Sequence, residues 1–421
     1  MNVWETTAAL LAQHLSTAVK LDALLDALPS QFTPVDRRRC RHLLYGTVRH
    51  RALLDHVLHA YLRRPPRPLL HAALLLGAFE LLDEPERSPT IVHHAVEHTR
   101  KLTSPAEARL VNAVLRRVPP GLREVLDRPS GDAAQLALRC SHPEWLVTRW
   151  IHRWGLPTVH QLLEWNQQPA IIYARVTKAE EDPPPDYFKA SPFPGFFRLD
   201  RPDWNDVERR LADGLIYIQD PATAISPGLL AVTSGETVLD LCAAPGGKTL
   251  QLAEAAGATG RVVAVDLPGS RLDRLRENLA HHPTRPVTVL GADVATLTGA
   301  NLAEKGLPAS YDAVLVDVPC SNTGVLRHRV DAKWRLQPRD LEALPPRQLE
   351  LLRRAAELVR PGGRLVYSTC SLEPEENEGV ATNFISNAGG EFELVAAKSS
   401  QPWATGCDGA GAFLFRRRAT P

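Results

Sequence analysis

Two cysteines occupy matching positions in the second half of the chain. Cys320 lies in the string DVPCSNTGV at residues 317–325, and Cys370 lies in STCSLEPEEN at residues 368–377. Each string follows a short apolar run that predicts a buried strand. A lone cysteine at a strand end is usually a small buried hydrophobe. Two cysteines in two such loops instead indicate thiol chemistry, in which an ionised sulfur attacks an electron-poor carbon.

Acidic residues mark the same kind of strand end. Asp266 and Asp317 each end an expected strand, and Asp293 follows another. Ligands of open parallel sheets bind at the carboxyl ends of the strands. Asp266 is placed to accept hydrogen bonds from two ribose hydroxyls, and Asp293 from an adenine amino group. These carboxylates predict a nucleoside ligand.

A glycine-rich turn joins the first of these strands to a helix. The string DLCAAPGGKT at 240–249 supplies the candidate binding residues Cys242, Ala243, Ala244, Pro245, Gly246, Gly247 and Lys248. The turn matches neither GxGxxG nor GxxxxGK[ST], so a phosphate cradle is not the first choice. Glycines at such a turn let a ligand approach the backbone closely. With the carboxylates, the turn predicts an adenosine ligand bearing a sulfonium, which describes S-adenosylmethionine. Arg271 is expected over its ribose or adenine, or else on a solvated helix face.

Thiols beside a methyl-donor site predict methylation of a pyrimidine at C5. That carbon is a poor nucleophile until a thiolate adds to C6 and turns the ring into an enamine. Loss of the C5 proton and expulsion of the thiolate then complete the cycle. The attacking thiol must be partly ionised, and Lys248 and Lys333 are candidate cations. Asp317 is expected to hold the exocyclic amine and N3 of cytosine.

Alternating strands and helices must position these residues from about residue 220 onward. Strands are expected at 237–242, 261–266, 287–290, 313–317 and 364–368, and helices at 248–256, 270–281, 339–359 and 375–386. Short apolar strands that alternate with helices predict an α/β fold with a parallel sheet covered on both faces. We assign this domain to residues 217–421.

The first 128 residues predict a separate helical domain. Apolar residues recur at spacings of three and four, and prolines divide them into five or six helices, including Leu43–Leu62 and a buried core helix at Leu69–Leu82. Asp36 and Ser104 are expected helix N-caps. Residues 129–216 predict a small α+β connector.

Composition limits the possible functions. The 421 residues suggest two or three domains, and a net charge of +1 argues against a strongly basic nucleic-acid binder. The excess of basic residues lies in residues 1–128, which hold 18 Lys and Arg against 13 Asp and Glu. Such a segment is typical of an RNA-docking module. Arg37, Arg38, Arg39 and Arg41 are candidate phosphate contacts, or else the solvated face of a helix.

Other features argue against metal, disulfide and membrane classes. The six cysteines include no CxxC pair, so neither a metal site nor a disulfide framework is expected. The longest apolar stretch is shorter than the ~18–20 residues that a membrane span needs. No signal peptide is visible. We therefore expect a cytoplasmic protein in a reducing compartment, and a monomer.

The three strings resemble the RsmB (Sun/Fmu) family of bacterial 16S rRNA cytosine-C5 methyltransferases, and the resemblance extends over essentially the whole chain. Residues 1–128 are similar to a NusB-type RNA-binding domain, with LLYG at 43–46 and LVNAVLR at 110–116 as matching pieces. The resemblance implies a Rossmann-like class I methyltransferase domain with a mostly parallel seven-stranded sheet. It also implies S-adenosylmethionine as cofactor and unassembled 16S rRNA as partner.

The resemblance further implies a role for each cysteine. Cys370, in the TCS motif, would be the nucleophile, and Cys320, in the PC motif, would assist breakdown of the adduct and product release. Cofactor contacts would come from the turn at 242–248 and from the three aspartates. Lys333 and Trp334 would lie in a loop that lines the RNA pocket.

Three departures from the family pattern stand out. Val330 replaces a proline in the run that ends at Trp334, the third strand is followed by GAD rather than GD, and the segment Asp408–Phe415 has extra small residues.

Alternative functions stay open at this point. A DNA cytosine methyltransferase also has a PC motif and uses that cysteine as nucleophile, but Cys370 and the helical domain favour RNA. A tRNA target is a further alternative within the family. A non-catalytic, NusB-like RNA-binding or antitermination factor is disfavoured because every cysteine and acidic residue of the motifs is present. The base that removes the C5 proton is not identified.

Overall fold

The computed structural model describes residues 2–17, 19–128, 131–178, 184–283 and 287–419. It divides into two compact units, Met1–Gln168 with Leu326–Leu336, and Pro169–Val325 with Gln337–Pro421. The single connector expected at 129–216 is therefore not observed. Its first part continues the helical unit, for example through a hydrogen bond from the Ala52 N–H to Ser141 Oγ (2.8 Å), and its second part begins the other unit.

The first unit is helical, as expected. Its helices are α1 (Val3–Thr17), α2 (Leu21–Asp26), α3 (Pro34–Arg49), α4 (Arg51–His59), α5 (Pro68–Asp83), α6 (Ser88–Leu102), α7 (Pro105–Leu115), α8 (Val118–Leu126), α9 (Ala133–Arg139), α10 (Glu144–Trp154), α11 (Leu156–Gln167) and α17 (Ala332–Arg335). Helix α5 is the buried core helix, since Leu74, Leu75 and Leu76 are all fully buried. Every helix in the described ranges is too short or too polar to span a bilayer.

Local details of this unit differ from the prediction. The helix expected at Leu43–Leu62 is two helices, because His50 leaves the helical region with φ −99° and ψ 11° between α3 and α4. Ser104 caps α7 as predicted, and its hydroxyl accepts the N–H of Glu107. Thr33, rather than Asp36, caps α3, while Asp36 is its partner in the capping box.

The segment Leu326–Leu336 is part of the helical unit although it is distant in sequence. Val330 is 1% exposed and belongs to the same hydrophobic core as α5. The Trp334 indole N–H donates to the Val48 carbonyl oxygen (2.8 Å), and Lys333 Nζ donates to the carbonyl oxygen of Arg49 (3.0 Å). These contacts complete the core with residues that no local pattern assigned to it.

The second unit contains two sheets. The smaller has the antiparallel order β2-β3-β1-β4 and consists of β1 (Tyr173–Val176), β2 (Phe188–Ala190), β3 (Phe196–Leu199) and β4 (Ile216–Ile218), with helix α12 (Trp204–Ala212) between β3 and β4 in sequence. Antiparallel pairing of such short strands agrees with the α+β character expected here.

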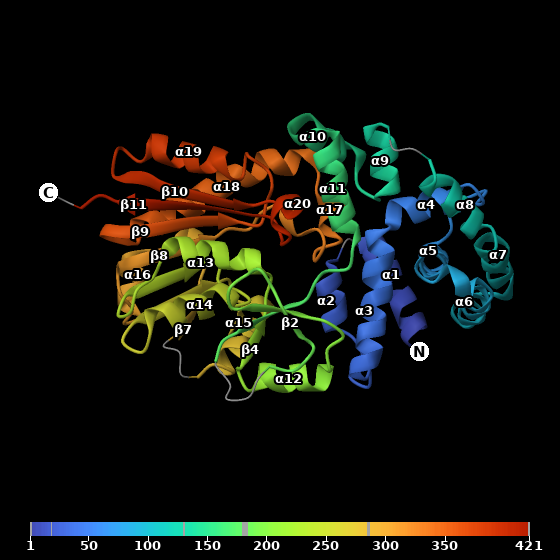
Figure 1. Ribbon diagram of the computed structural model, residues 1–421, viewed down its shortest axis with the longest axis horizontal. Coiled ribbons are helices and arrows are strands. Elements are labelled where there is room, and N and C mark those ends of the chain that lie inside the picture. Colours follow the sequence, from blue (N-terminus) through green and yellow to red (C-terminus); the bar gives the residue numbers. More distant parts are fainter. Residues whose placement is uncertain (1, 18, 129–130, 179–183, 284–286, 420–421) are drawn as a thin grey trace. The chain divides into compact units, whose positions relative to one another are not determined.

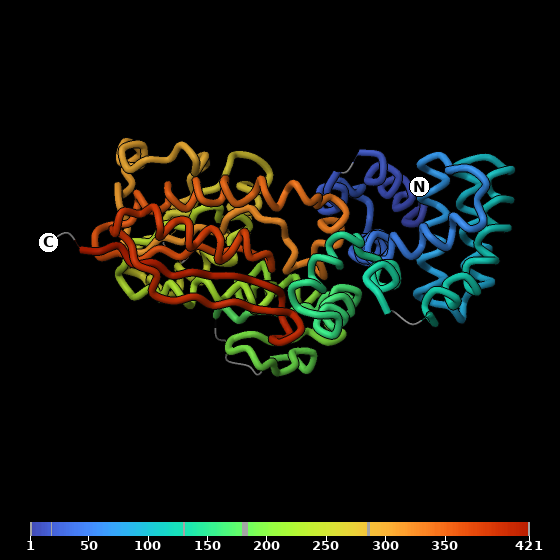
Figure 2. The backbone as a smooth tube through the Cα atoms, turned by 90° about the horizontal axis from the view of Figure 1, so that it is seen from above, coloured from blue at the N-terminus to red at the C-terminus, as the bar shows by residue number. Residues whose placement is uncertain are grey.

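The larger sheet has seven strands in the order β10-β11-β9-β8-β5-β6-β7. Their bounds are β5 (Thr237–Leu241), β6 (Arg261–Asp266), β7 (Val287–Gly291), β8 (Tyr311–Asp317), β9 (Val359–Thr369), β10 (Phe392–Ser400) and β11 (Ala410–Arg417). Strands β5 to β9 pair in parallel, and in the C-terminal hairpin β10–β11, red in Figure 2, β11 pairs antiparallel with both β9 and β10. The predicted mostly parallel seven-stranded sheet is confirmed.

Helices cover both faces of this sheet (Figure 1). Helices α18 (Pro338–Glu357) and α19 (Glu378–Asn387) pack on one face. Helices α13 (Ile225–Leu230), α14 (Gly247–Ala256) and α15 (Ser270–Ala280) pack on the other. The central strands β5, β6 and β8 are mostly apolar on both sides for this reason.

The strand register brings the motif loops to one edge of the sheet. Leu241 pairs with Val265 and with Val316, and Asp317 pairs with Ser368. The loops that follow β5, β6, β8 and β9 therefore leave the sheet side by side. The chain order reverses on the two sides of β5, which is the place where parallel sheets bind ligands.

Candidate active site

The turn after β5 has a backbone that requires glycine. Gly246 has φ +109°, and a Cβ there would lie 2.8 Å from Leu275 Cδ1. Helix α14 begins at the next residue, so its first N–H groups face the strand edge. Cys242 also lies in this turn, and burial raises the pKa of its thiol to about 12. Cys242 therefore stays protonated and plays no part as a nucleophile.

Asp266, at the end of β6, holds this turn in place. Its Oδ2 accepts the N–H of Ala244 (2.8 Å) and its Oδ1 accepts the N–H of Leu267 (2.8 Å). Arg271 Nη2 donates to the Ala244 carbonyl oxygen at 3.2 Å and lies 3.5 Å from Asp266 Oδ2. Asp266 and Arg271, both predicted as cofactor contacts, therefore meet at the turn. An ionised carboxylate has about four lone-pair sites, so Asp266 keeps capacity for a ligand.

Asp293 lies apart from these contacts. It is exposed after β7, and its Oδ1 accepts the N–H of Ala295 (3.0 Å) at the start of a short 3-10 turn. Its position at the same sheet edge is the one predicted, since β7 pairs with β6 from Val262 to Asp266.

Lys248 and Asp317 form an ion pair beneath the turn. Lys248 Nζ lies 2.5 Å from Asp317 Oδ1, which also accepts the hydroxyl of Ser368 (2.8 Å). Burial lowers the pKa of Lys248, but the charge and hydrogen bond of Asp317 outweigh it, so the net pKa is raised. Lys248 is thus a cation at neutral pH.

The two cysteines predicted to act together lie in contact. Cys320 Sγ and Cys370 Sγ are 3.0 Å apart, and both residues are half-buried. The Asn322 side chain is hydrogen-bonded to both cysteine residues. Its Oδ1 accepts from Cys370 Sγ (3.4 Å), and its Nδ2 donates to the Cys320 carbonyl oxygen (2.8 Å). The close approach of the loops depends on Gly324, where a Cβ would lie 2.8 Å from the Cys370 carbonyl oxygen.

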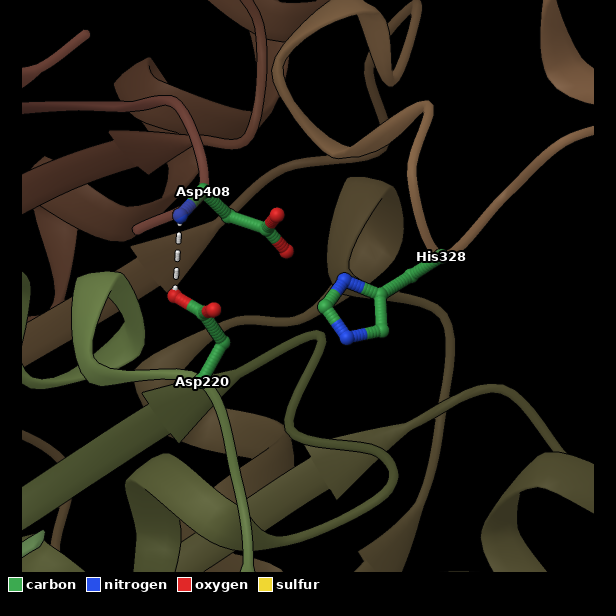
Figure 3. Close-up of side chains that lie close together, drawn as sticks. All are labelled: Asp220, His328 and Asp408. Atoms are coloured by element: carbon green, nitrogen blue, oxygen red, sulfur yellow. Dashed lines mark hydrogen bonds between the residues drawn. The ribbon is translucent and has the colours of Figure 1, made fainter. Parts of the chain in front are cut away.

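A small pocket of about 40 Å³ opens beside Cys370 and Lys248. Its wall includes the start of β11 and the segment near Asp220. The Asp408 N–H donates to Asp220 Oδ1 at 3.1 Å, which joins these two parts of the wall (Figure 3).

Two buried carboxyl groups at the site were not singled out from the sequence. Asp240, in β5, is fully buried and accepts the hydroxyl of Thr249 (2.6 Å), and burial raises its pKa to about 7. Glu376 is also fully buried, between the two cysteine loops. The only sequence signal was its place in the string that carries Cys370.

The arginines predicted to contact phosphate differ in their exposure and in their contacts within the protein. Arg37 donates to the carbonyl oxygens of Pro29 and Phe32, and Arg39 pairs with Glu80 (2.7 Å). Arg38 and Arg41 are exposed on α3, with the Arg41 guanidinium 5.1 Å from the centre of the Tyr45 ring.

Lys333 and Trp334, both expected at an RNA pocket, bind backbone oxygens at the end of α3. Lys333 is 1% exposed, and its ammonium is bound to a carbonyl oxygen inside the helical unit. Trp334 is bound to the same end of α3. The expectation that Lys333 contacts RNA, or serves as the cation beside a thiol, is not supported, because this segment supplies core packing.

Comparisons with known proteins agree with the two units. Residues 227–410 match the family model of the 16S rRNA methyltransferase RsmB/F, and residues 2–119 match the NusB family model. The chain is 30% identical over 403 residues to ribosomal RNA small subunit methyltransferase B of Salmonella arizonae, which covers 91% of this chain and 90% of that protein. The protein of the same name from Serratia proteamaculans is 29% identical over 415 residues, covering 95% and 94%. The crystal structure of PH0851 has a TM-score of 0.79 at 24% identity and covers 99% of both chains, which shows the fold alone.

Proposed function

Because the chain belongs to the RsmB family of 16S rRNA methyltransferases, we propose that it methylates C5 of a specific cytosine in 16S rRNA, through a covalent bond between Cys370 and C6. The observation that carries this proposal is the contact of two thiols, 3.0 Å apart, at the sheet edge that also bears the glycine turn. Nucleophilic addition to a pyrimidine requires a thiolate, and a second thiol beside it suits release of the product.

The residues at the sheet edge fit S-adenosylmethionine as the methyl donor. The turn at Gly246 admits a ligand close to the backbone, and Asp266 and Asp293 offer carboxylate acceptors after neighbouring strands. When bound, this cofactor supplies a methyl group on a positively charged sulfur. An edge lined with carboxylates favours a cationic ligand over a phosphate-bearing one.

Cys370 begins the reaction on the cytosine ring. Its thiolate bonds to C6, which makes C5 nucleophilic, and C5 then takes the methyl group. The C5 proton leaves, and the Cys370–C6 bond breaks to restore the aromatic ring. Cys320, in contact with Cys370, assists this last step.

Lys248 and Asp317 prepare the pocket for this addition. Lys248 and Cys370 line the same pocket, so a cation is available beside the sulfur that is proposed to attack C6. Asp317 uses Oδ1 for both Lys248 and Ser368, and none of the described residues donates to Oδ2. We assign Oδ2 to the exocyclic amine of cytosine, which selects cytosine over uracil.

Bisulfite sequencing of total RNA from a strain that lacks the gene tests the proposal. The expected result is loss of a single 5-methylcytosine from 16S rRNA, restored by the wild-type gene. A change confined to tRNA or DNA, or no change in any nucleic acid, would overturn it.

Replacing Lys333 with methionine is expected to leave RNA affinity and its salt dependence unchanged, since the ammonium is buried on the Arg49 carbonyl oxygen. A phosphate contact would instead lower the slope of log K against log salt by about 1. Fluorescence anisotropy with a 16S rRNA fragment at several salt concentrations measures this slope. Arg41→Met, a change at an exposed arginine of the same unit, is the comparison. A lower slope for Lys333→Met would show that the lysine reaches RNA.

A further inference from the structure

The small antiparallel sheet packs against the glycine turn and against the helix that follows the turn. A Cβ at Gly247, the first residue of α14, would lie 2.8 Å from Gln219 Nε2 and 3.0 Å from Tyr217 Cε1. Tyr217 lies on β4, and Gln219 directly follows that strand. Since no side chain fits between the helix and the strand, this second glycine is required by a contact within the protein.

A buried ion pair fixes the same contact further along α14. Arg175, on β1, pairs through Nη1 with Oε2 of Glu254 (2.6 Å) and donates from Nε to Gln219 Oε1 (3.1 Å). Glu254 belongs to α14. Arg175 is 6% exposed and Gln219 is 8% exposed, so water competes little for these bonds. The small sheet and α14 therefore support the turn together.

Two side chains from different elements hold the carbonyl oxygen of Pro245, in the middle of the turn. Asn278 Nδ2, on α15, donates to this oxygen at 2.8 Å, and the Tyr217 hydroxyl donates to it at 3.2 Å. Asn278 Nδ2 also donates to the Tyr217 oxygen (3.2 Å), so the three groups are bonded to one another. Burial raises the pKa of Tyr217 to about 12, so its hydroxyl keeps the donated proton at neutral pH.

These bonds fix a peptide group that the backbone alone holds at one end. Pro245 has no N–H, and within the described ranges no backbone N–H donates to its carbonyl oxygen. At the other end of this peptide group, the Gly246 N–H donates to the Ala243 carbonyl oxygen (2.9 Å). Because a peptide group is planar, bonds at both ends fix its orientation. Helix α14 begins directly after it, so this plane sets the direction of the first N–H groups, which have no partner within the helix.

We propose that Tyr217 and Asn278 are positioning residues for S-adenosylmethionine: they fix the peptide group between Pro245 and Gly246, and with it the N–H groups that the start of α14 presents to the cofactor. Neither side chain has to touch the cofactor, because both act through the turn. The identity of the ligand rests on the proposed function, whereas the hydrogen bonds do not.

Calorimetric titration of the full chain with S-adenosylmethionine, without RNA, tests this inference. If the turn adopts other orientations, the dissociation constant rises by the reciprocal of the fraction that stays competent. Asn278→Ala removes both bonds of the amide and is expected to weaken binding about tenfold, while Tyr217→Phe removes one bond, keeps the ring, and is expected to weaken it about threefold. At saturating cofactor, the single-turnover rate of both variants is expected to stay within about a factor of two of the wild type.

Each variant has a matched control. Glu277→Ala changes an exposed residue beside Asn278 on the same helix, and Tyr187→Phe removes a hydroxyl that donates to Asp206, away from the turn. Both controls are expected to bind the cofactor as the wild type does.

Wild-type dissociation constants in folded Asn278→Ala and Tyr217→Phe would overturn the inference alone. So would variants whose rate at saturating cofactor falls as far as their affinity, because the bonds would then support the fold in general. A wild-type chain that binds no S-adenosylmethionine would overturn the proposed cofactor together with the inference.

Discussion

A Cys370→Ala enzyme is expected to transfer methyl groups to 16S rRNA slower than the wild type by a factor on the order of 10⁴. Without the sulfur, C6 of the cytosine receives no nucleophile and C5 stays unreactive. Cys320 does not substitute for it, because burial still raises the pKa of its thiol after the hydrogen bond with Cys370 is lost. Single-turnover transfer from radiolabelled S-adenosylmethionine measures the rate, and calorimetry checks that the cofactor still binds.

Cys407→Ala is the control for this variant. Cys407 is a buried cysteine of the same unit, with Sγ 3.2 Å from Ser400 Oγ, and its loss is expected to leave the rate within about a factor of two. If Cys370→Ala stays active while Cys320→Ala is inactive, the roles of the two cysteines are reversed, as in the DNA enzymes.

Asp317→Asn is expected to lower the rate by about 10²-fold or more and to destabilise the fold by about 1–3 kcal/mol. The substitution removes the charge that holds Lys248 Nζ at 2.5 Å, and it removes the acceptor proposed for the cytosine amine. The Lys248 side chain is 18% exposed, so its ammonium would remain partly buried without a counter-charge.

The wild type and Asp317→Asn are expected to differ in how their stability changes with pH. In the wild type the pKa of Lys248 is higher in the folded state than in the unfolded state. The stability that the charged lysine adds is therefore fully present below its unfolded pKa and is lost as the pH rises through its folded pKa. In Asp317→Asn, both contributions of Asp317 are lost, and only the smaller ones of Cys370 and Asp240 still oppose burial, so the pKa of Lys248 is expected to fall below its unfolded value. The unfolded chain then binds more protons than the folded one, so the variant gains stability relative to the wild type as the pH rises towards 10.5.

Denaturant unfolding at several pH values measures this difference. Asp273→Asn is the control, because the Asp273–Arg276 pair is exposed at 63% and 53% and breaking it is expected to cost little. Equal stability and activity of Asp317→Asn and wild type would contradict the proposed role of the ion pair.

Local patterns were sufficient to predict the strand ends. Short apolar runs next to glycine or acidic residues located β5, β6 and β8, and parallel pairing then brought Asp266, Asp317 and both cysteine loops to one edge. The contact of Cys320 with Cys370 followed from this topology, since β8 and β9 are neighbours.

Contacts between distant segments were not predictable in the same way. Lys333 and Trp334 bind carbonyl oxygens at the end of α3, and no periodicity in either segment encodes that pairing. Glu376 is buried between two loops, whereas a glutamate in a polar string is ordinarily expected on the surface. His50 divides a continuous apolar pattern into α3 and α4 through its backbone conformation alone.

A trapped protein–RNA adduct is the most direct test of covalent catalysis by Cys370. The Cys320→Ala enzyme, incubated with 16S rRNA and S-adenosylmethionine, is expected to accumulate a complex that survives denaturing electrophoresis, because the Cys370–C6 bond forms but breaks slowly. The adduct should be absent from the double variant that also carries Cys370→Ala. A Cys320→Ala enzyme that turns over without any adduct, or an adduct that persists in the double variant, would contradict the proposed mechanism.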